Sequence, residues 1–254
     1  MNIGDRMKRY EEAARTVLPP RTPVILRIDG KAFHTYTRGC KRPFDERLSG
    51  VMVDTAKELC KQIQGAQFAY TQSDEISIFI HSYKKFDSSA WFDNQVQKIT
   101  SVAASIAAAT FTMNSWKIWV PEAPTGSVAG YMKPAYFDAR VASYPENEVC
   151  NYFIWRQQDA TRNSIQMLAR SLYSHKECDN KNTNELREMC FQKGLNWNDL
   201  EVRWKRGIVV EHYLRETQLN GNSIIRGEWE PNLDIPIFTQ DRQFIEKYLK
   251  CDEA

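Results

Sequence analysis

Between residues 20 and 145 the spacing of apolar residues changes repeatedly from that of a strand to that of a helix. Strand patterns fall at 23–28, 67–71, 75–82 and 135–143, and helical spacings of three and four fall at 45–64 and 90–114. The order is therefore β-α-β-β-α-β, which is the ferredoxin-like plan. We predict an α+β fold, with an antiparallel sheet that carries its helices on one face.

The rest of the chain adds elements to this core. We predict helices at 4–17, 147–174 and near 240–250, a strand at 204–213, a loop at 121–134 and a mixed polar segment at 175–203. The whole chain, 1–254, is thus interpreted as one domain. Its core covers about 20–145, and its C-terminal extension covers about 146–254.

Composition narrows the class of protein. The chain has 254 residues, of which 42% are apolar, so its core needs neither metals nor disulfides to hold it. A net charge of +2 means that any nucleic-acid surface must be a local patch. The six cysteines form no CxxC pair and are expected to be reduced. The sequence shows neither a signal peptide nor an apolar run near the ~18–20 residues of a membrane span. We expect a cytoplasmic protein without a membrane partner.

Two strands end on carboxylates. Asp29 and Gly30 follow the strand at 23–28, and Asp74 and Glu75 interrupt the pair at 67–82. Strands 1 and 3 are central neighbours in the ferredoxin-like plan, so Asp29 and Asp74 could meet. Paired carboxylates repel unless a proton or a cation intervenes.

Such a pair suits Mg²⁺, which takes one or two carboxylates together with backbone oxygens, water and phosphates. Two such ions can clamp a phosphoryl displacement. The Gly30 carbonyl could join the carboxylates, and Lys31, His34 and Lys98 could hold a triphosphate.

A bland interpretation stays open for each motif, since Asp-Gly after a strand is usually a turn and an Ser-Asp-Glu hairpin tip is usually solvated. The chain lacks GxSxG, Walker A and GxGxxG motifs, which argues against a serine nucleophile of that type and against those phosphate-binding loops. Lys and Arg become frequent between 156 and 206. They either form a solvated face or contact RNA phosphates, which fix position without reading sequence.

Five segments together resemble the tRNA-His guanylyltransferase superfamily. They are RIDGKAFH at 27–34, YTQSDEISIFI at 70–80, the helix with Lys98, YFDARVASYP at 136–145 and WRQQDATRNSIQ at 155–166. Lys205-Arg206-Gly207 is similar to the family's last strand motif, and the resemblance covers residues 4–215. It implies a polymerase-palm-like catalytic domain that adds nucleotides in the 3′→5′ direction to the 5′ end of tRNA.

The resemblance also implies roles for individual residues. Asp29, Gly30 and Asp74 would bind two Mg²⁺ ions, and Glu75 matches an important acidic position that need not touch metal. The implied GTP, ATP or other NTP site comprises Arg27, Asp29, Gly30, Lys31, Ala32, Phe33, His34, Ser73, Asp74 and Lys98. We select Arg156, Arg162, Asn163, Lys205 and Arg206 as tRNA contacts. The C-terminal extension would contact tRNA and support assembly, since family members are commonly homotetramers.

Departures from the family pattern narrow the activity. Eukaryotic guanylyltransferases have HINNLYN where this chain has TRNSIQM from Thr161, and Gln95 and Thr183 replace basic residues. In these positions the chain is similar to the bacterial and archaeal guanylyltransferase-like proteins, which repair truncated tRNA 5′ ends by templated addition. The incoming NTP would attack an activated 5′ phosphate through its 3′-hydroxyl.

Four other interpretations stay open. The protein could be a tRNA-His guanylyltransferase proper, which adds one G, or a palm-type nucleotidyl cyclase that needs the same two acids but no tRNA surface. An RNA-recognition module has the same element order, but it would show aromatics in its central strands. A paralogue that binds tRNA without catalysis is the fourth.

Overall fold

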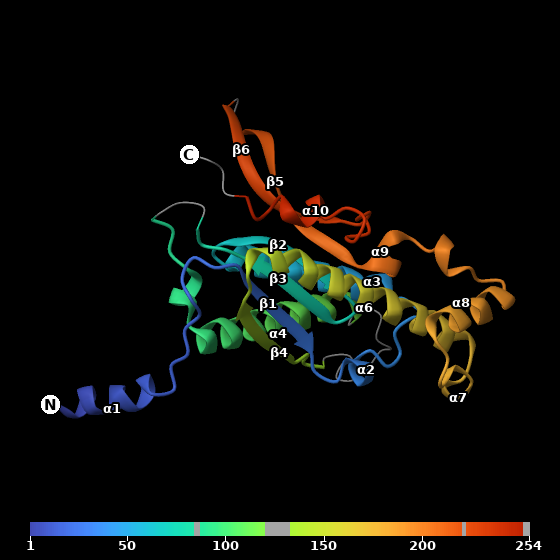
Figure 1. Cartoon of the computed structure of the whole chain (residues 1–254), viewed down its shortest axis with the longest axis horizontal. Coiled ribbons are helices and arrows are strands. Elements are labelled where there is room, and N and C mark those ends of the chain that lie inside the picture. The colour runs from blue at the N-terminus through green and yellow to red at the C-terminus, as the bar shows by residue number, and fades with distance from the viewer. Residues whose placement is uncertain (84–86, 120–132, 220–221, 251–254) are drawn as a thin grey trace.

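The structure is a computed structural model that describes residues 1–83, 87–119, 133–219 and 222–250. Within these ranges a six-stranded antiparallel sheet has the order β4-β1-β3-β2-β5-β6 (Figure 1). Its strands are β1 (Val24–Gly30), β2 (Ala66–Gln72), β3 (Glu75–Ile80), β4 (Phe137–Ser143), β5 (Ile208–Leu219) and β6 (Asn222–Asn232). Most of the loop predicted at 121–134 lies outside the described residues.

One face of the sheet is covered by α3 (Glu46–Gln62) and α4 (Val96–Trp119), which confirms the predicted plan of the core. Asp45 begins α3, because its carboxylate accepts the Arg47 backbone N–H at 3.0 Å. Ala103 and Ala107 are fully buried, and their small size lets α4 pack closely. Together with β1 and β3, these two helices enclose the first apolar core. The predicted start of the second helix is wrong, since η1 (Trp91–Asn94) precedes α4.

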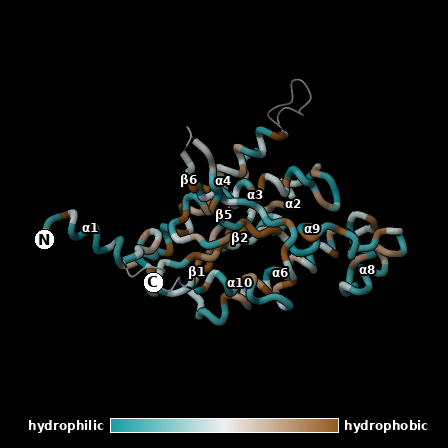
Figure 2. The backbone as a smooth tube through the Cα atoms, turned by 90° about the horizontal axis from the view of Figure 1, so that it is seen from above, coloured by the Kyte–Doolittle hydropathy of each residue, from teal (hydrophilic) through white to brown (hydrophobic). Residues whose placement is uncertain are grey.

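The opposite face, which we expected to be open, is covered by the first half of α6 (Glu146–Leu172). The apolar residues here come from β1, β2 and β3 on one side and from α6 and α10 (Gln243–Glu246) on the other. They include Ile25, Phe68, Tyr70, Phe79, Val149, Phe153 and Ile245. The sheet is therefore a middle layer, and Figure 2 shows its hydrophobic strands in the centre of the molecule.

The second half of α6 extends beyond the sheet and packs on a small C-terminal cluster. This cluster holds α7 (His175–Cys178), α8 (Thr183–Gln192) and η3 (Trp197–Asp199), and α9 (Val202–Arg206) follows it. The predicted strand at 204–213 is wrong at its start, since Trp204, Lys205 and Arg206 are helical. Gly207, with φ of 84°, ends α9 before β5 begins.

Two elements extend away from the body. Strand β5 pairs with β2 from Ile208 to Glu211. Beyond Glu211 it pairs with β6 alone. The N-terminal helix, α1 (Ile3–Glu12), is shorter than the predicted 4–17 and buries no residue. Figure 1 shows it standing apart from the sheet, so Ile3, Met7 and Tyr10 stay exposed.

Candidate active site

The ends of β1 and β3 lie side by side, as the element order predicted. The register pairs Ile28 with Ile76 and Asp29 with Glu75. One step further, the Gly30 N–H donates a hydrogen bond to the Asp74 backbone oxygen at 3.1 Å. Asp29 and Asp74 are thus carried by two adjoining chain segments in the middle of the sheet.

The loop after β1 is held tightly. The Lys31 N–H donates to the Tyr136 carbonyl at 2.8 Å, and the Phe33 side chain is buried at the start of α2 (Phe33–Tyr36). A Cβ on Gly30 would lie 2.3 Å from Phe33 Cδ2, so the glycine makes room for that ring. The ring fixes the backbone of the predicted nucleotide loop.

Two residues of the predicted nucleotide site have strained backbones. Ala32 has φ of 54° and Ser73 has φ of 51°, both in the left-handed region that non-glycine residues seldom adopt. Ser73 directly precedes Asp74, and Ala32 lies three residues after Asp29. Strain of this kind gathers at functional sites, because the surrounding structure must enforce it.

Burial and neighbouring acids both disfavour the charged forms of Asp29 and Asp74, while three arginines partly offset this around Asp29. Burial raises the pKa of Asp29, and the neighbouring Asp138 raises it further. Burial also raises the pKa of Asp74, and Asp29 adds to that effect, although the Ser73 hydroxyl donates to the Asp74 carboxylate at 3.0 Å. A cation between the carboxylates would relieve this repulsion.

The donor set fits Mg²⁺. Among the described residues, no three or more His, Cys, Asp or Glu side chains gather in a way that could hold a metal ion by themselves. Asp29 and Asp74, with the Gly30 carbonyl beside them, offer hard oxygen ligands. That number leaves positions for water and phosphate, as Mg²⁺ prefers.

Glu75 has a different environment from Asp74. It is 7% exposed, and its carboxylate lies 3.2 Å from Arg156 Nε and 3.3 Å from Ser77 Oγ. Arg156 itself is 4% exposed. This burial contradicts the selection of Arg156 as a tRNA contact, because its guanidinium is enclosed between α6 and the sheet.

Sequence reasoning missed Asp138 and Arg140 as site residues. On edge strand β4 they pair in register with Asp29 and Arg27, and an ion pair of 2.8 Å joins them. Both side chains are 58% exposed. The signal was present in the FDAR segment, whose alternation places two charged residues on one face of a strand.

Other predicted residues lie at varied distances from the carboxylates. Lys31 is exposed on the loop after β1, and His34 is exposed on α2. Lys98 lies in the first turn of α4, about 20 Å along the helix from Phe111, whose ring contacts Phe33. The structure therefore does not bring Lys98 to Asp29 within one chain.

The residues predicted to contact tRNA also differ in their environments. Arg162 is 58% exposed and paired with Asp159, whereas Lys205 Nζ donates to the Asn198 carbonyl at 2.6 Å. The Arg206 carbonyl accepts from the Tyr70 hydroxyl at 2.6 Å, which ties α9 to β2.

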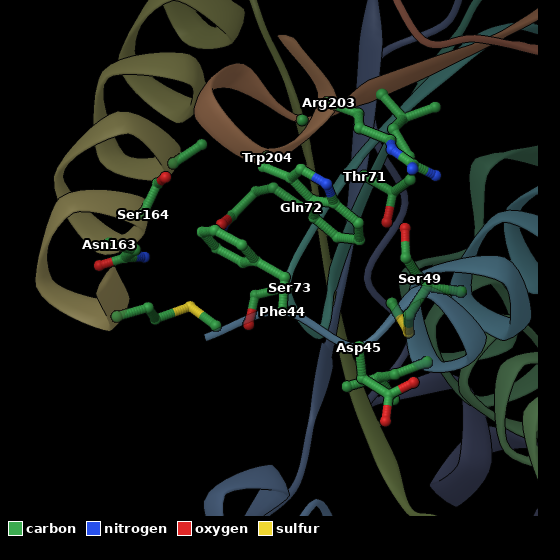
Figure 3. A pocket seen from close by; sticks show the side chains of 16 residues that line it. Phe44, Asp45, Ser49, Thr71, Gln72, Ser73, Asn163, Ser164, Arg203 and Trp204 are labelled. Carbon is green, nitrogen blue, oxygen red and sulfur yellow. The ribbon is translucent and has the colours of Figure 1, made fainter. Parts of the chain in front are cut away.

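A pocket opens beside the turn that carries Asp74 (Figure 3). Its walls come from the start of α3, the end of β2, α6 and α9. Phe44, Asp45, Ser73, Asn163, Arg203 and Trp204 are among its lining residues. The Phe44 and Trp204 rings stack at 5.0 Å, and Arg203 lies 4.6 Å from the Trp204 ring centroid. The pocket thus combines flat aromatic surface with polar groups, and it reaches Ser73, the residue before Asp74.

Comparisons with known proteins agree with this geometry. The family model described as tRNAHis guanylyltransferase (Thg1) matches residues 4–145, which is more than half of the chain. A bacterial tRNA(His) guanylyltransferase (Thg1)-like protein solved in complex with ATP is 42% identical. The match has a TM-score of 0.86 and covers 99% of this chain and 100% of that one.

Two further relatives extend the comparison. A bacterial Thg1-like protein in complex with GTP is also 42% identical, with a TM-score of 0.79 and coverage of 97% and 98%. The tRNA(His) guanylyltransferase of Debaryomyces hansenii is 28% identical over 222 residues, which are 82% of this chain and 79% of that protein.

The palm-like fold and these matches identify the chain as a nucleotidyltransferase. The chain belongs to the tRNAHis guanylyltransferase family, as the resemblance predicted. In the part of the chain that the structure describes, no helix has both the length and the apolar character needed to cross a bilayer.

Proposed function

We propose that this enzyme adds nucleotides in the 3′→5′ direction to the 5′ end of tRNA and copies the opposite strand as template. The main support for this proposal is the pair of carboxylates, Asp29 and Asp74, where the end of β1 lies beside the start of β3. The similar bacterial proteins solved with ATP and with GTP support nucleoside triphosphates as substrates.

Asp29, Asp74 and the Gly30 carbonyl would hold two Mg²⁺ ions. Bound there, the metal would lower the pKa of the attacking 3′-hydroxyl and stabilise charge on the pyrophosphate that leaves the 5′-triphosphorylated end. The exposed Lys31, on the loop after β1, and the exposed His34, on α2, would contact the triphosphate. The tight hold on that loop orients it before the substrate arrives, which favours in-line transfer.

The pocket beside Ser73 would take the nucleoside of a bound NTP. The stacked Phe44 and Trp204 rings offer a flat apolar wall, and such walls accept any base. Asn163 adds hydrogen-bonding groups to the same pocket, whereas the Asp45 carboxylate is already bonded to Arg47 and the Lys41 N–H. A base here would place its phosphates toward the turn that carries Asp74.

Templated repair is favoured over addition of a single G. Eukaryotic enzymes have a histidine at the position of Thr161, whose hydroxyl here donates to the Lys205 carbonyl at 3.2 Å. Because the Thr161 hydroxyl is bonded to the backbone of α9, it is not available to recognise one particular tRNA. Pairing with the template would then select the incoming nucleotide through geometry.

The C-terminal extension, 146–254, would contact tRNA, with the exposed Arg162 as one contact. We also propose a homotetramer in the cytoplasm. An isolated ten-residue helix is marginal in water, so α1, with Ile3, Met7 and Tyr10 exposed, needs a covering surface. Light scattering on the intact chain and on a variant with Met7→Glu tests the assembly.

The activity is tested with a 5′-triphosphorylated tRNA that lacks its first nucleotide. Mg²⁺ and each labelled NTP are supplied separately, and the template base opposite the gap is changed in a second substrate. We expect only the complementary nucleotide to be incorporated on both substrates. Incorporation of G regardless of template, on tRNA-His alone, would instead identify a guanylyltransferase proper.

A further inference from the structure

Glu75 is an acidic residue of the site whose carboxylate faces a buried cation. It sits at the first position of β3, directly after Asp74 and opposite Asp29 in the register. Its carboxylate faces Arg156 Nε at 3.2 Å and Ser77 Oγ at 3.3 Å. These partners tie it to α6 and to its own strand.

Arg156 is an unusual residue to enclose in a domain. Its guanidinium cannot be deprotonated, so burial is tolerated only beside carboxylates. Besides Glu75, its second nitrogen donates to Asp159 at 2.5 Å, and its Cζ lies 4.0 Å from the Trp155 ring centroid. Asp159 in turn pairs with the exposed Arg162 at 2.6 Å.

The contact between Arg156 and Glu75 is chiefly electrostatic. The two atoms are close, yet Arg156 Nε has no well-aligned hydrogen bond. The Ser77 hydroxyl, which is 3.0 Å from the Tyr152 hydroxyl, donates to the same Glu75 oxygen, Oε1, that faces Arg156 Nε. Arg156 therefore fixes Glu75 by charge, while neighbouring hydroxyl groups define its orientation.

We propose that Arg156 is a positioning residue for nucleotidyl transfer. It holds Glu75 against α6 and thereby fixes the start of β3, the turn that carries Asp74, relative to Asp29. Without it, the buried Glu75 carboxylate would lose the cation that contacts it and would move toward water or toward the metal site. The proposal rests on the proposed function and assigns Glu75 the role of an anchor rather than a metal ligand.

A double-mutant cycle tests this role. Arg156→Met, Glu75→Gln and the double variant are compared in single-turnover addition to the truncated tRNA. We expect Arg156→Met to lower the rate at saturating NTP about 100-fold, while the NTP concentration for half-saturation changes less than about threefold. The double variant should be no slower than the slower single variant, because both changes remove one unit.

Two further variants separate positioning from general stability. Arg156→Lys keeps the charge and should recover about tenfold of the lost rate. Arg242→Met removes an exposed arginine that pairs with Glu246 at 3.0 Å, and it should leave the rate within about twofold of wild type. A lower unfolding midpoint for Arg156→Met with an unchanged rate in the folded fraction would overturn the proposal, as would multiplicative effects of Arg156→Met and Glu75→Gln.

Thermal unfolding supplies a readout that does not depend on activity. Arg156→Met removes the cation that contacts the buried Glu75 carboxylate, while Arg27 remains nearby, and should lower the midpoint. Adding Glu75→Gln should restore much of the loss, because a neutral amide is less costly to bury. If wild type adds no nucleotide to any tRNA, the proposed function fails. The unfolding data still test the ion pair by themselves. If Glu75→Gln does not restore the midpoint of Arg156→Met, the Arg156–Glu75 pair on which the positioning role depends is overturned.

Discussion

The two faces of the sheet are built from the same strands but differ in chemistry. The face under α3 and α4 is an apolar core in which Leu26, Ile28, Ile76 and Ile78 are fully buried. The face under α6 is apolar only toward one end. Toward the other end it carries a charged group of six residues: Arg27, Asp29, Glu75, Asp138, Arg140 and Arg156.

Strand alternation explains this difference, because Arg27 and Asp29 point to one side and Leu26 and Ile28 to the other. The face under α3 and α4 can therefore supply free energy of folding through apolar burial. The face under α6 can then hold charged side chains whose burial does not favour folding. The comparison predicts that changes on the charged face alter chemistry and that changes on the apolar face alter stability.

The largest effect is expected from the two carboxylates. Asp29→Ala or Asp74→Ala should lower nucleotide addition at least about a thousandfold, a loss of roughly 4 kcal/mol of transition-state stabilisation. The apo protein should unfold at an equal or higher temperature, because a repelling charge is removed. Asp54→Ala, an exposed change on α3, is the matched control. Normal addition by either variant would remove the metal site from this face.

A change in the apolar core should give the reverse pattern. Leu59 on α3 is fully buried, so Leu59→Ala should lower the free energy of unfolding by about 2–5 kcal/mol. Urea denaturation measures this loss. The rate of the folded fraction should stay within about threefold of wild type. A large loss of rate at unchanged stability would mean that the two faces do not divide as described.

Gly30 lies where the two faces meet, so its substitution should affect both. In Gly30→Ala the new methyl would meet the Phe33 ring at 2.3 Å. We expect a loss of about 1–3 kcal/mol in unfolding free energy and a clearly weaker NTP affinity. Gly50→Ala has open space around its Cβ and should be neutral or stabilising. Equal behaviour of the two variants would contradict the account of the nucleotide loop.

Asp45, in the pocket wall, should give a smaller and pH-dependent effect. Hydrogen bonds from Arg47 and the Lys41 backbone outweigh the opposing effect of burial and lower its pKa from 3.8 to about 2. Because the folded-state pKa is lowered, the charged form stabilises the fold above about pH 4, and this contribution disappears as the pH falls toward 2.

Asp45→Asn should therefore cost about 2 kcal/mol at pH 6 and much less at pH 2.5. Urea unfolding of both proteins at the two pH values measures the difference. A pH-independent difference would show that the carboxylate charge is not what Asp45 contributes.

Much of the core followed from the sequence, because strand and helix periods were clear in 23–143 and the element order fixes which strands are central. The meeting of Asp29 and Asp74 follows from that order. Strand β6 was missed because it is an edge strand, and most of its hairpin with β5 extends past β2, where no apolar alternation is needed. Residues 204–206 were misassigned, since only the left-handed Gly207 separates α9 from β5.

The errors within the site share one cause. A sequence shows that Arg156 is charged but not that α6 folds across the sheet and encloses it between two carboxylates. For the same reason Asp138 was seen as part of a motif but not as the cross-strand neighbour of Asp29. Burial and register are properties of packing, and the linear pattern gives them only for the elements whose partners are already known.

Metal binding tests the central claim most directly. Mn²⁺ can be titrated by electron paramagnetic resonance into the intact enzyme with a non-hydrolysable NTP analogue, for wild type, Asp29→Asn, Asp74→Asn and Glu75→Gln. The account predicts two Mn²⁺ per chain in wild type, loss of binding in both aspartate variants, and retention in Glu75→Gln. Loss in Glu75→Gln with retention in Asp29→Asn would contradict it.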